Sequence, residues 1–194
     1  MAKEYWKGGN MLSPLPVVMV SCKRKDEKPN IITIAWAGTV CTNPPMVSIS
    51  IKPSRYSFDI IKESKEFVIN IVTKSICKET DYCGVKSGRD LDMFKETGLT
   101  PFDSKYVSAP SILESPMNIE CRVTQIIPLG SHSMFIAEVL GVTIEDTHLN
   151  ENNKFELNKL GLVAYSHGEY HTIGEKIGNF GFSVRKKRIK RHKK

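Results

Sequence analysis

The sequence predicts a mainly β fold with a few helices, built as a closed or nearly closed antiparallel barrel. Six or seven short runs alternate apolar and polar residues with the period of two that half-buried strands show. Strand and helix units do not alternate strictly, as a parallel nucleotide-binding sheet requires. The Gly-rich loops G-x-G-x-x-G and G-x-x-x-x-G-K-[ST] are also missing. Any nucleotide must therefore bind by another route.

The strands are expected from two kinds of run. Residues 47–52, 67–71 and 119–127 alternate, and the last of these places Glu120 and Arg122 on its polar face. Residues 15–20, 30–37 and 134–144 are short, apolar and rich in β-branched residues, which favours strands. Turn-forming residues separate the runs at positions 25–29, 42–45 and 128–131. The first of these turns predicts a hairpin.

Helices are expected at fewer places. Ser57 is predicted to cap a helix that runs to about Ser64, with Phe58 and Ile61 on its inner face. Further helices are expected at residues 74–82 and 90–96, the second ended by Gly98, and one more turn at residues 158–162. All of these helices are insertions between strands.

Composition predicts a single domain followed by a tail. The chain has 194 residues, 40% of them apolar and 25% charged, with a net charge of +7. Residues 185–194 read RKKRIKRHKK and hold eight Lys or Arg, so residues 1–184, the predicted domain, are close to neutral. Such a run repels itself and is typical of a disordered, solubilising tail.

The sequence favours a protein of the cytoplasm. No apolar run approaches the roughly 20 residues of a membrane span. The first residues lack the apolar stretch of a signal peptide. Five cysteines, an odd number without a C-x-x-C pair, argue for free thiols rather than a disulfide framework.

Residues 53–57 could bind a phosphate group. They lie between an expected strand and an expected helix, and they supply Ser54, Ser57, the Arg55 guanidinium and a helix N-terminus. Backbone N–H groups and the helix dipole favour an anion there, and arginine donates a fork of hydrogen bonds to phosphate oxygens. The alternative is a capped helix with a solvated arginine.

Residues 30–41 read NIITIAWAGTVC, and their small side chains could admit a flat ligand. Ala35, Ala37 and Gly38 leave the backbone accessible, and Trp36 could lie beside a ring. The alternative is a tight barrel interior in which small residues relieve crowding.

The stretch from Thr33 to Ser57 resembles the signature of the flavin reductase-like, FMN-binding split-barrel family, especially its flavoredoxin branch. The agreement covers roughly residues 12–182. It continues in Phe67-Val68-Ile69-Asn70, Asp81-Tyr82-Cys83-Gly84, Ser87-Gly88-Arg89-Asp90, Glu120-Cys121-Arg122, Gly130-Ser131-His132 and Tyr165-Ser166-His167-Gly168-Glu169-Tyr170.

The resemblance implies a homodimeric, antiparallel Greek-key split barrel that holds FMN non-covalently near the subunit interface. It implies the phosphate corner Ser54, Arg55, Tyr56 and Ser57, and a flavin lining of Thr33, Ala35, Trp36 and Ala37, with Cys41 nearby and Asn30 toward the polar edge. Ser87 and Gly88 would close over the cofactor, from the same or the partner subunit. Many relatives have a lysine where Met93 stands here, and Lys95 follows Phe94 instead.

The implied function is an FMN-dependent oxidoreductase that passes electrons from NAD(P)H or a reduced protein through FMN to an acceptor. The flavin carries that chemistry, so no catalytic triad is needed. His132 is a possible site residue, or a solvated turn histidine. One alternative is a small nucleic-acid-binding barrel that uses the basic tail, although the neutral body makes nucleic acid an unexpected partner. Another is a non-catalytic FMN-binding protein. Neither a metal nor a membrane is expected.

Overall fold

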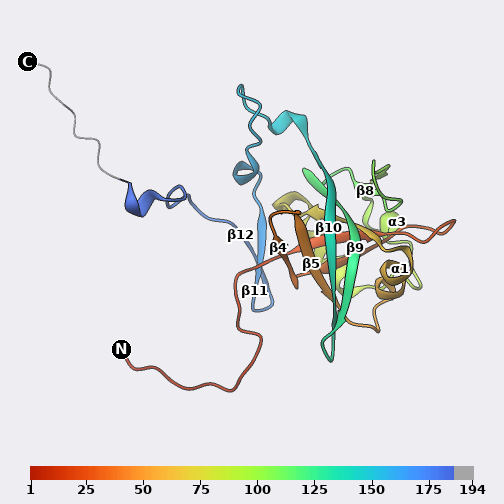
Figure 1. The fold of residues 1–194 in the computed structure, drawn as a ribbon, viewed down its shortest axis with the longest axis horizontal. Helices are drawn as coiled ribbons and strands as arrows, with labels where there is room; N and C mark the ends of the chain where they lie inside the picture. Colours follow the sequence, from red (N-terminus) through yellow and green to blue (C-terminus); the bar gives the residue numbers. More distant parts are fainter. Residues whose placement is uncertain (186–194) are drawn as a thin grey trace, which may run out of the picture.

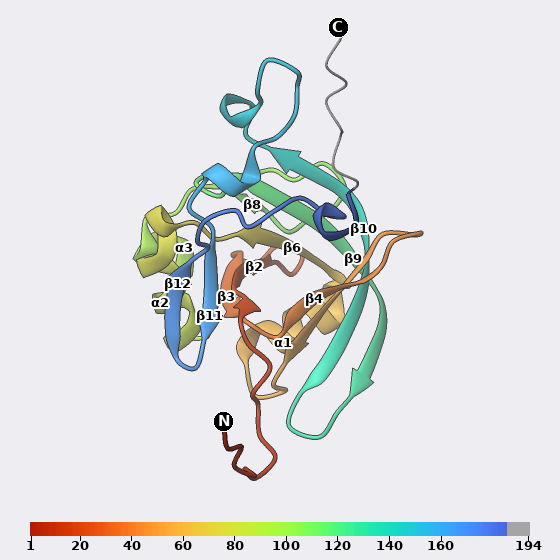
Figure 2. The ribbon, with the colours of Figure 1, turned by 90° about the vertical axis from the view of Figure 1, so that its left-hand side faces the viewer.

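The computed structural model describes residues 1–185, so all of the predicted basic tail except Arg185 lies outside the described residues. Seven strands of this part of the chain form one antiparallel sheet in the order β3-β2-β6-β9-β10-β5-β4. In that order they are Asn30–Ile34, Val18–Cys22, Glu66–Ile71, Met117–Pro128, Ser133–Ile144, Met46–Ile51 and Ala37–Cys41. The sheet curls into an incomplete barrel (Figures 1 and 2), which confirms the predicted mainly β, antiparallel split barrel.

Smaller elements surround the barrel. A three-stranded sheet holds β1 (Leu15–Pro16), β11 (Val163–Ser166) and β12 (Glu169–Thr172), and β7 (Pro101–Phe102) pairs with β8 (Ser111–Ile112). The α-helices are α1 (Tyr56–Ser64), α2 (Cys77–Val85) and α3 (Met93–Thr97). Short 3-10 turns are η1 (Lys74–Ile76), η2 (Asp146–His148), η3 (Leu157–Lys159) and η4 (Phe182–Val184).

The predicted turns join strands as expected. β2 and β3 form the hairpin around residues 25–29, with Cys22 opposite Asn30. β4 and β5 pair across residues 42–45, and β9 and β10 pair across residues 129–132. The alternation in β5 is confirmed, because Val47, Ile49 and Ile51 are buried and the residues between them are half-buried.

The barrel is open between β3 and β4, and the prediction of one strand over residues 30–37 is wrong. β3 ends at Ile34, and β4 begins at Ala37 on the opposite edge of the sheet. The chain must cross the opening, so Ala35 and Trp36 leave the ladder, although the Trp36 carbonyl accepts a hydrogen bond from the Ser50 N–H (2.8 Å). Small residues on both sides of Trp36 allow this crossing.

Apolar residues lie on both faces of β2, which makes every residue of that strand buried. Val18, Val20 and Cys22 belong to the core inside the barrel. Val17 and Met19 belong to a second cluster on the outer side, beneath α2 and α3. A strand covered on both faces loses its alternation in favour of a continuous apolar run.

The outer face of β6 and β9 corrects a second expectation. Glu120, predicted on a polar face, is 1% exposed. Its carboxylate accepts hydrogen bonds from the backbone N–H groups of Lys105 and Tyr106, so the loop between β7 and β8 covers this face. Val68 on β6 packs against Val107 of the same loop. The β7–β8 loop, which is distant from β6 in sequence, therefore shields this face from solvent.

Helix positions follow the prediction, but their ends differ. α1 begins at Tyr56 with Arg55 as its N-cap, and no side chain of the described part of the chain caps it, so the prediction of a Ser57 cap is wrong. The Ser57 hydroxyl is buried and accepts a hydrogen bond from Asn30 instead. α3 begins at Met93, later than expected, because the Asp92 carboxylate caps it by accepting from the Lys95 N–H (3.2 Å). Gly98 ends α3 in the left-handed conformation, as expected.

Within residues 1–185, none of the helices combines the length and the apolar character needed to cross a membrane.

Candidate functional site

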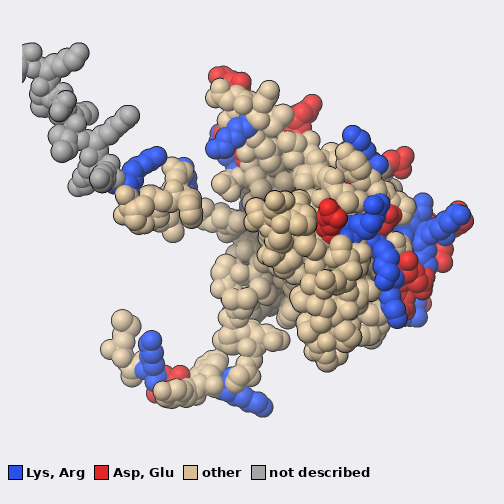
Figure 3. Space-filling model, viewed as in Figure 1, with Lys and Arg blue, Asp and Glu red and all other residues tan. Residues whose placement is uncertain are grey.

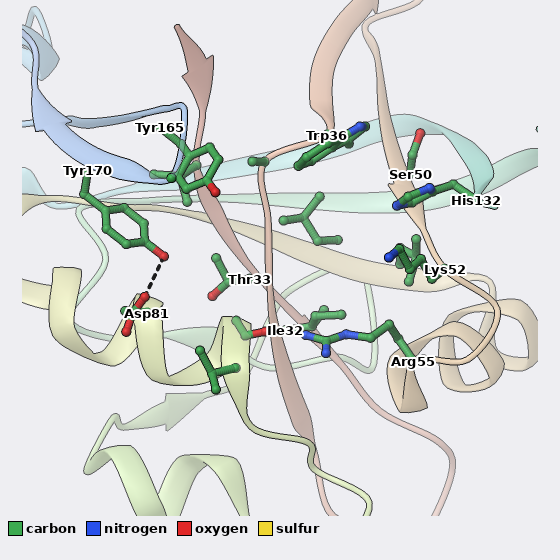
Figure 4. A pocket seen from close by; sticks show the side chains of 17 residues that line it. Ile32, Thr33, Trp36, Ser50, Lys52, Arg55, Asp81, His132, Tyr165 and Tyr170 are labelled. Atoms are coloured by element: carbon green, nitrogen blue, oxygen red, sulfur yellow. Dashed lines mark hydrogen bonds between the residues drawn. The ribbon is translucent and has the colours of Figure 1, made fainter. Parts of the chain in front are cut away.

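A cavity of about 400 Å³ lies at the opening of the barrel. β3 forms its floor, and the residues that follow it lead across the opening (Figure 4). One wall comes from the end of β5, the residues after it and the β9–β10 turn; the other comes from α2 and the β11–β12 hairpin. The side chains used below are Thr33, Trp36, Ser50, Lys52, Arg55, Asp81, His132, Tyr165 and Tyr170.

The predicted phosphate corner lies at one end of this cavity. Arg55 is half-buried, and its Nη2 atom donates to the Gly84 carbonyl at the end of α2 (2.6 Å). Ser54 is exposed beside it. Within residues 1–185 no side chain caps α1, and of its first N–H groups Phe58 donates to the Arg55 carbonyl (2.9 Å), which leaves those of Tyr56 and Ser57 for an anion. The structure thus brings the guanidinium and a helix N-terminus together at the cavity, whereas Ser54 is not one of the residues that line it.

Ser57 and Asn30 lie behind the corner rather than in it. Both are buried, and the Asn30 Nδ2 atom donates to the Ser57 hydroxyl (2.8 Å). With Arg55, Tyr56, Ser87 and Gly88 they line a void of about 10 Å³. Ser57 therefore supports the corner through Asn30, and its side chain does not reach the cavity.

Asn30 Oδ1 is a buried acceptor without a hydrogen-bond partner within residues 1–185. Gly88 covers it so closely that a Cβ atom added there would lie 1.7 Å from Oδ1. An unpaired buried acceptor is costly. The contact explains why glycine stands at position 88, and the open acceptor marks a place for a donor near the corner.

Two rings form part of the wall opposite α2. The Trp36 and His132 rings are stacked, with centroids 6.0 Å apart and planes 8° from parallel. The Ser131 hydroxyl lies 2.9 Å from His132 Nδ1. Ser50 and Lys52 lie beside them (Figure 4). His132 is thus a residue of the cavity rather than a fully solvated turn histidine.

The opposite wall consists of residues that sequence reasoning did not assign to the site. Tyr165 and Tyr170 meet edge to face, with ring centroids 5.6 Å apart. The Tyr170 hydroxyl donates to Asp81 Oδ1 on α2 (3.0 Å; Figure 4). Burial raises the pKa of Tyr170, and the neighbouring Asp81 raises it further, so the phenol remains a donor. The tyrosine spacing around the Ser166–Glu169 turn indicates a hairpin, but nothing in it shows what the hairpin packs against.

The remaining predicted residues are only partly brought together. Thr33 and Ala35 line the cavity, and the Thr33 hydroxyl donates to the Thr80 carbonyl. Ala37 lines an adjoining groove along β4, and Cys41, at the end of that strand, lines neither space.

Cys83 lies next to the cavity but is not a reactive nucleophile. Its side chain is buried in the outer cluster, and burial raises its pKa to about 12. Very little thiolate is therefore present near neutral pH. The structure therefore assigns Cys83 to the packing of the outer cluster.

Comparison with known proteins decides the family. The model of the flavin reductase like domain matches residues 11–174. The chain belongs to the flavin reductase-like split-barrel family. The opening between β3 and β4 is therefore the split of a family barrel, and the cavity lies in that split.

Solved structures place the chain in the flavoredoxin branch of this family. Flavoredoxin of Desulfovibrio vulgaris (Miyazaki F) is 30% identical, with a TM-score of 0.88 over 95% of this chain and 100% of that one. Flavoredoxin from Methanosarcina acetivorans is 27% identical, with a TM-score of 0.84 over the same shares. An uncharacterized protein of Archaeoglobus fulgidus is 34% identical over 75% of this chain and 81% of its own length.

Proposed function

We propose that this flavin reductase-like chain binds FMN in the split of its barrel and passes electrons from NAD(P)H, or from a reduced redox protein, through it to an acceptor. One observation carries the proposal. The cavity runs from an opening of the sheet, with exposed backbone and small side chains, to a helix N-terminus that carries Arg55. A flat ring system with a phosphate tail has that shape and charge.

The residues present fit such a group. At the phosphate end, Ser54, Arg55 and the first N–H groups of α1 would hold the anion, and Ser87 and Gly88 approach from the loop after α2. The unpaired Asn30 Oδ1 beside that loop offers an acceptor to a hydroxyl donor.

The walls provide the remaining contacts. Thr33, Ala35 and Trp36 would line the rings along β3 and its crossing, as expected from the sequence. Lys52 adds a positive charge to the wall that also holds His132. Positive charge and N–H donors on one wall stabilise negative charge on a bound ring system.

When bound, FMN supplies hydride or single-electron transfer, and the chain has to bind, orient and tune it. Arg55 fixes one end of the group. The stacked Trp36 and His132 rings on one side and Tyr165 on the other reduce the access of water. The Tyr170–Asp81 hydrogen bond holds the hairpin in place.

The proposal includes a homodimer. Residues 173–184 extend away from the barrel, and so does the N-terminal segment (Figures 1 and 2). Ile177 is 92% exposed and Phe180 fully exposed. The surface between the two segments carries few charges (Figure 3). Beside the N-terminal segment, a groove is lined by Leu12, by the edge strand β4 with its exposed Val40, and by the exposed Trp36 that precedes β4. An exposed apolar surface beside an unpaired strand edge favours contact with a second copy.

The proposed function is tested by flavin uptake and reduction. We expect the purified protein to be yellow or to take up added FMN, with FMN identified by mass after release. Rapid mixing with NADH and with NADPH then separates the two electron sources. Bleaching by either nucleotide indicates a reductase, whereas bleaching only by a reduced redox protein indicates a carrier. A colourless protein that takes up no flavin would refute the proposal.

A further inference from the structure

The helix α2 forms one wall of the cavity, yet few apolar side chains hold it in place. Two of its residues are buried, Thr80 and Cys83. Cys83 packs in the outer cluster, whereas the Thr80 hydroxyl donates back to the Ile76 carbonyl one turn earlier (2.7 Å). A short helix takes most of its stability from tertiary packing. Because α2 buries little apolar surface, its position depends on the polar contacts that it makes with its neighbours.

Two of these contacts come from the floor and from the phosphate corner. The Thr33 hydroxyl on β3 donates to the Thr80 carbonyl, and a Cβ atom at Gly84 would lie only 3.5 Å from Thr33 Cβ. Gly84 belongs to the last turn of α2, where carbonyl groups have no partner within the helix. Its carbonyl accepts from Arg55 Nη2 (2.6 Å), so the place of Gly84 sets the direction of the guanidinium beside the N-terminus of α1.

The third contact joins α2 to the β11–β12 hairpin through Asp81. Its Oδ1 atom accepts from the Tyr170 hydroxyl (3.0 Å), and Figure 4 shows this bond well apart from Arg55. Among the described residues Asp81 forms no ion pair, with Arg55 or with any other cation. Asp81 lies three residues before Gly84, within one turn and on the same face of the helix, so the two positions move together.

We propose that Asp81 is a positioning residue for the phosphate group of the bound flavin. The Tyr170 hydroxyl holds Asp81, the helix carries this constraint to the Gly84 carbonyl, and that carbonyl directs the Arg55 guanidinium toward the phosphate. This role rests on the proposed function, because the phosphate is that of FMN. It extends that function, because the hairpin then controls binding at the phosphate corner although no hairpin residue belongs to that corner.

The first test compares FMN with riboflavin, which has the same rings and no phosphate. The ratio of the riboflavin Kd to the FMN Kd measures what the phosphate contributes to binding. We expect Asp81→Ala and Tyr170→Phe each to lower this ratio about fivefold, because the guanidinium is misdirected rather than removed. A merely structural weakening of the cavity would raise both Kd values alike and leave the ratio unchanged. Tyr170→Phe keeps the ring, so it also serves if Asp81→Ala does not fold.

Three further variants separate the hydrogen bond from other causes. Asp81→Asn keeps an acceptor for Tyr170 and loses the charge, so its ratio should stay within about twofold of the wild type. Lys78→Ala, at an exposed residue of α2 that does not line the cavity, should also stay within about twofold. The double variant Asp81→Ala/Tyr170→Phe should resemble either single variant, because both remove one bond. A ratio unchanged in Asp81→Ala and Tyr170→Phe, or lowered equally in Asp81→Asn, would overturn the proposal.

The second test needs no flavin. In the flavin-free, full-length protein, the Arg55 Nε–H signal is followed by NMR and assigned by its absence in Arg55→Ala. We expect this proton to exchange with water about fivefold faster in Asp81→Ala and Tyr170→Phe, because the guanidinium leaves its fixed, half-buried place. Equal exchange in both variants and the wild type would refute the positioning role. A protein that binds neither flavin would instead refute the proposed function, and the Arg55 signal would still decide the role of Asp81.

Discussion

Arg55 joins the two helices that border the cavity, because it is the N-cap of α1 and donates to the last turn of α2. Its guanidinium is therefore already oriented before a ligand arrives. For Arg55→Ala we expect FMN to bind more weakly by about 1.5–3 kcal/mol, the range for hydrogen bonds to charged groups. This corresponds to roughly 10- to 150-fold in Kd, measured by quenching of flavin fluorescence.

Two variants sharpen the Arg55 experiment. Arg55→Lys keeps the charge but loses the fork of donors, so its Kd should fall between those of wild type and Arg55→Ala. Lys62→Ala removes an exposed cation at the other end of α1 and should leave the Kd unchanged. An Arg55→Ala protein that binds FMN like the wild type would remove Arg55 from the phosphate site.

Gly88 and Asn30 are too close for any larger residue at position 88. A Cβ atom in Gly88→Ala would lie 1.7 Å from Asn30 Oδ1 and 2.6 Å from its Cγ, so the loop must move away from the corner. We expect FMN affinity to fall by about tenfold, as one charge-assisted contact is lost.

The double variant tests the cause of this effect. Asn30→Ala in the Gly88→Ala chain removes the atoms that the new methyl group would meet, so the loop can return. In a double-mutant cycle on FMN affinity, the loss caused by Gly88→Ala should then be smaller in the Asn30→Ala background than in the wild type. Strict additivity would show that the clash is not the reason for the lost affinity.

At the scale of the element, the β11–β12 hairpin forms a wall that one hydrogen bond ties to α2. Tyr170→Phe removes the donor to Asp81 and leaves the ring. A bond of this kind contributes about 0.5–1.5 kcal/mol. We expect faster hydrogen exchange of the amides in β11 and β12, with β9 and β10 unchanged. Tyr165→Phe, which also loses a hydroxyl, should not change the exchange, because no hydrogen bond from that hydroxyl is found within residues 1–185.

The loop that covers β6 and β9 makes stability depend on pH through Glu66. Partial burial raises the pKa of Glu66, but hydrogen bonds from Ser108 and the nearby Arg122 outweigh this, and the net pKa is lowered. A pKa lowered in the folded state stabilises the fold above the unfolded pKa, and this contribution is lost as pH falls through the folded pKa.

The wild type should therefore have a larger free energy of unfolding than Glu66→Gln near neutral pH, and this difference should shrink as the pH falls below the ordinary glutamate range. Urea unfolding at several pH values measures the difference. The exposed Glu151→Gln serves as control. Parallel pH profiles for Glu66→Gln and the wild type would contradict the prediction.

The sequence predicts an element well when neighbouring residues determine it. The β2–β3 hairpin has its strands and its turn within residues 18–34, and alternation in β5 is visible over six residues. The end of β3 at Ile34 is different, because the apolar pattern continues through Ala35 and only the sheet's opening stops the ladder.

The same distinction holds for the site. Arg55 could be predicted because a strand end, an arginine and a helix start are adjacent in sequence. The sequence predicts that Ser57 caps α1, but its hydroxyl instead accepts a hydrogen bond from Asn30 on β3. Asp81 and Tyr170 are 89 residues apart, and nothing local indicates that they meet. Contacts between distant segments are thus the part that sequence reasoning missed.

At the scale of the whole molecule, the segment after β12 exposes apolar side chains for which a single chain offers no cover. Ile177 and Phe180 are exposed on an extended segment that stands away from the barrel (Figure 1). Burial of a large apolar side chain contributes about 1.5–3 kcal/mol, so a dimer in which both side chains are covered would be stabilised substantially. We expect the full-length protein to sediment as a dimer and the variant Ile177→Asp/Phe180→Asp to shift toward the monomer.

The control for the dimer is Leu113→Asp, which adds a charge at an exposed apolar residue of the loop after β8. It should leave the sedimentation unchanged, because that loop lies on the far side of the barrel from the extended segments (Figures 1 and 2). If the partner also completes the wall of the cavity, the Ile177→Asp/Phe180→Asp protein should bind FMN more weakly than the wild type at equal concentration. A wild-type chain that sediments as a monomer throughout would show that the exposed residues serve another contact, and that one chain forms the whole flavin site.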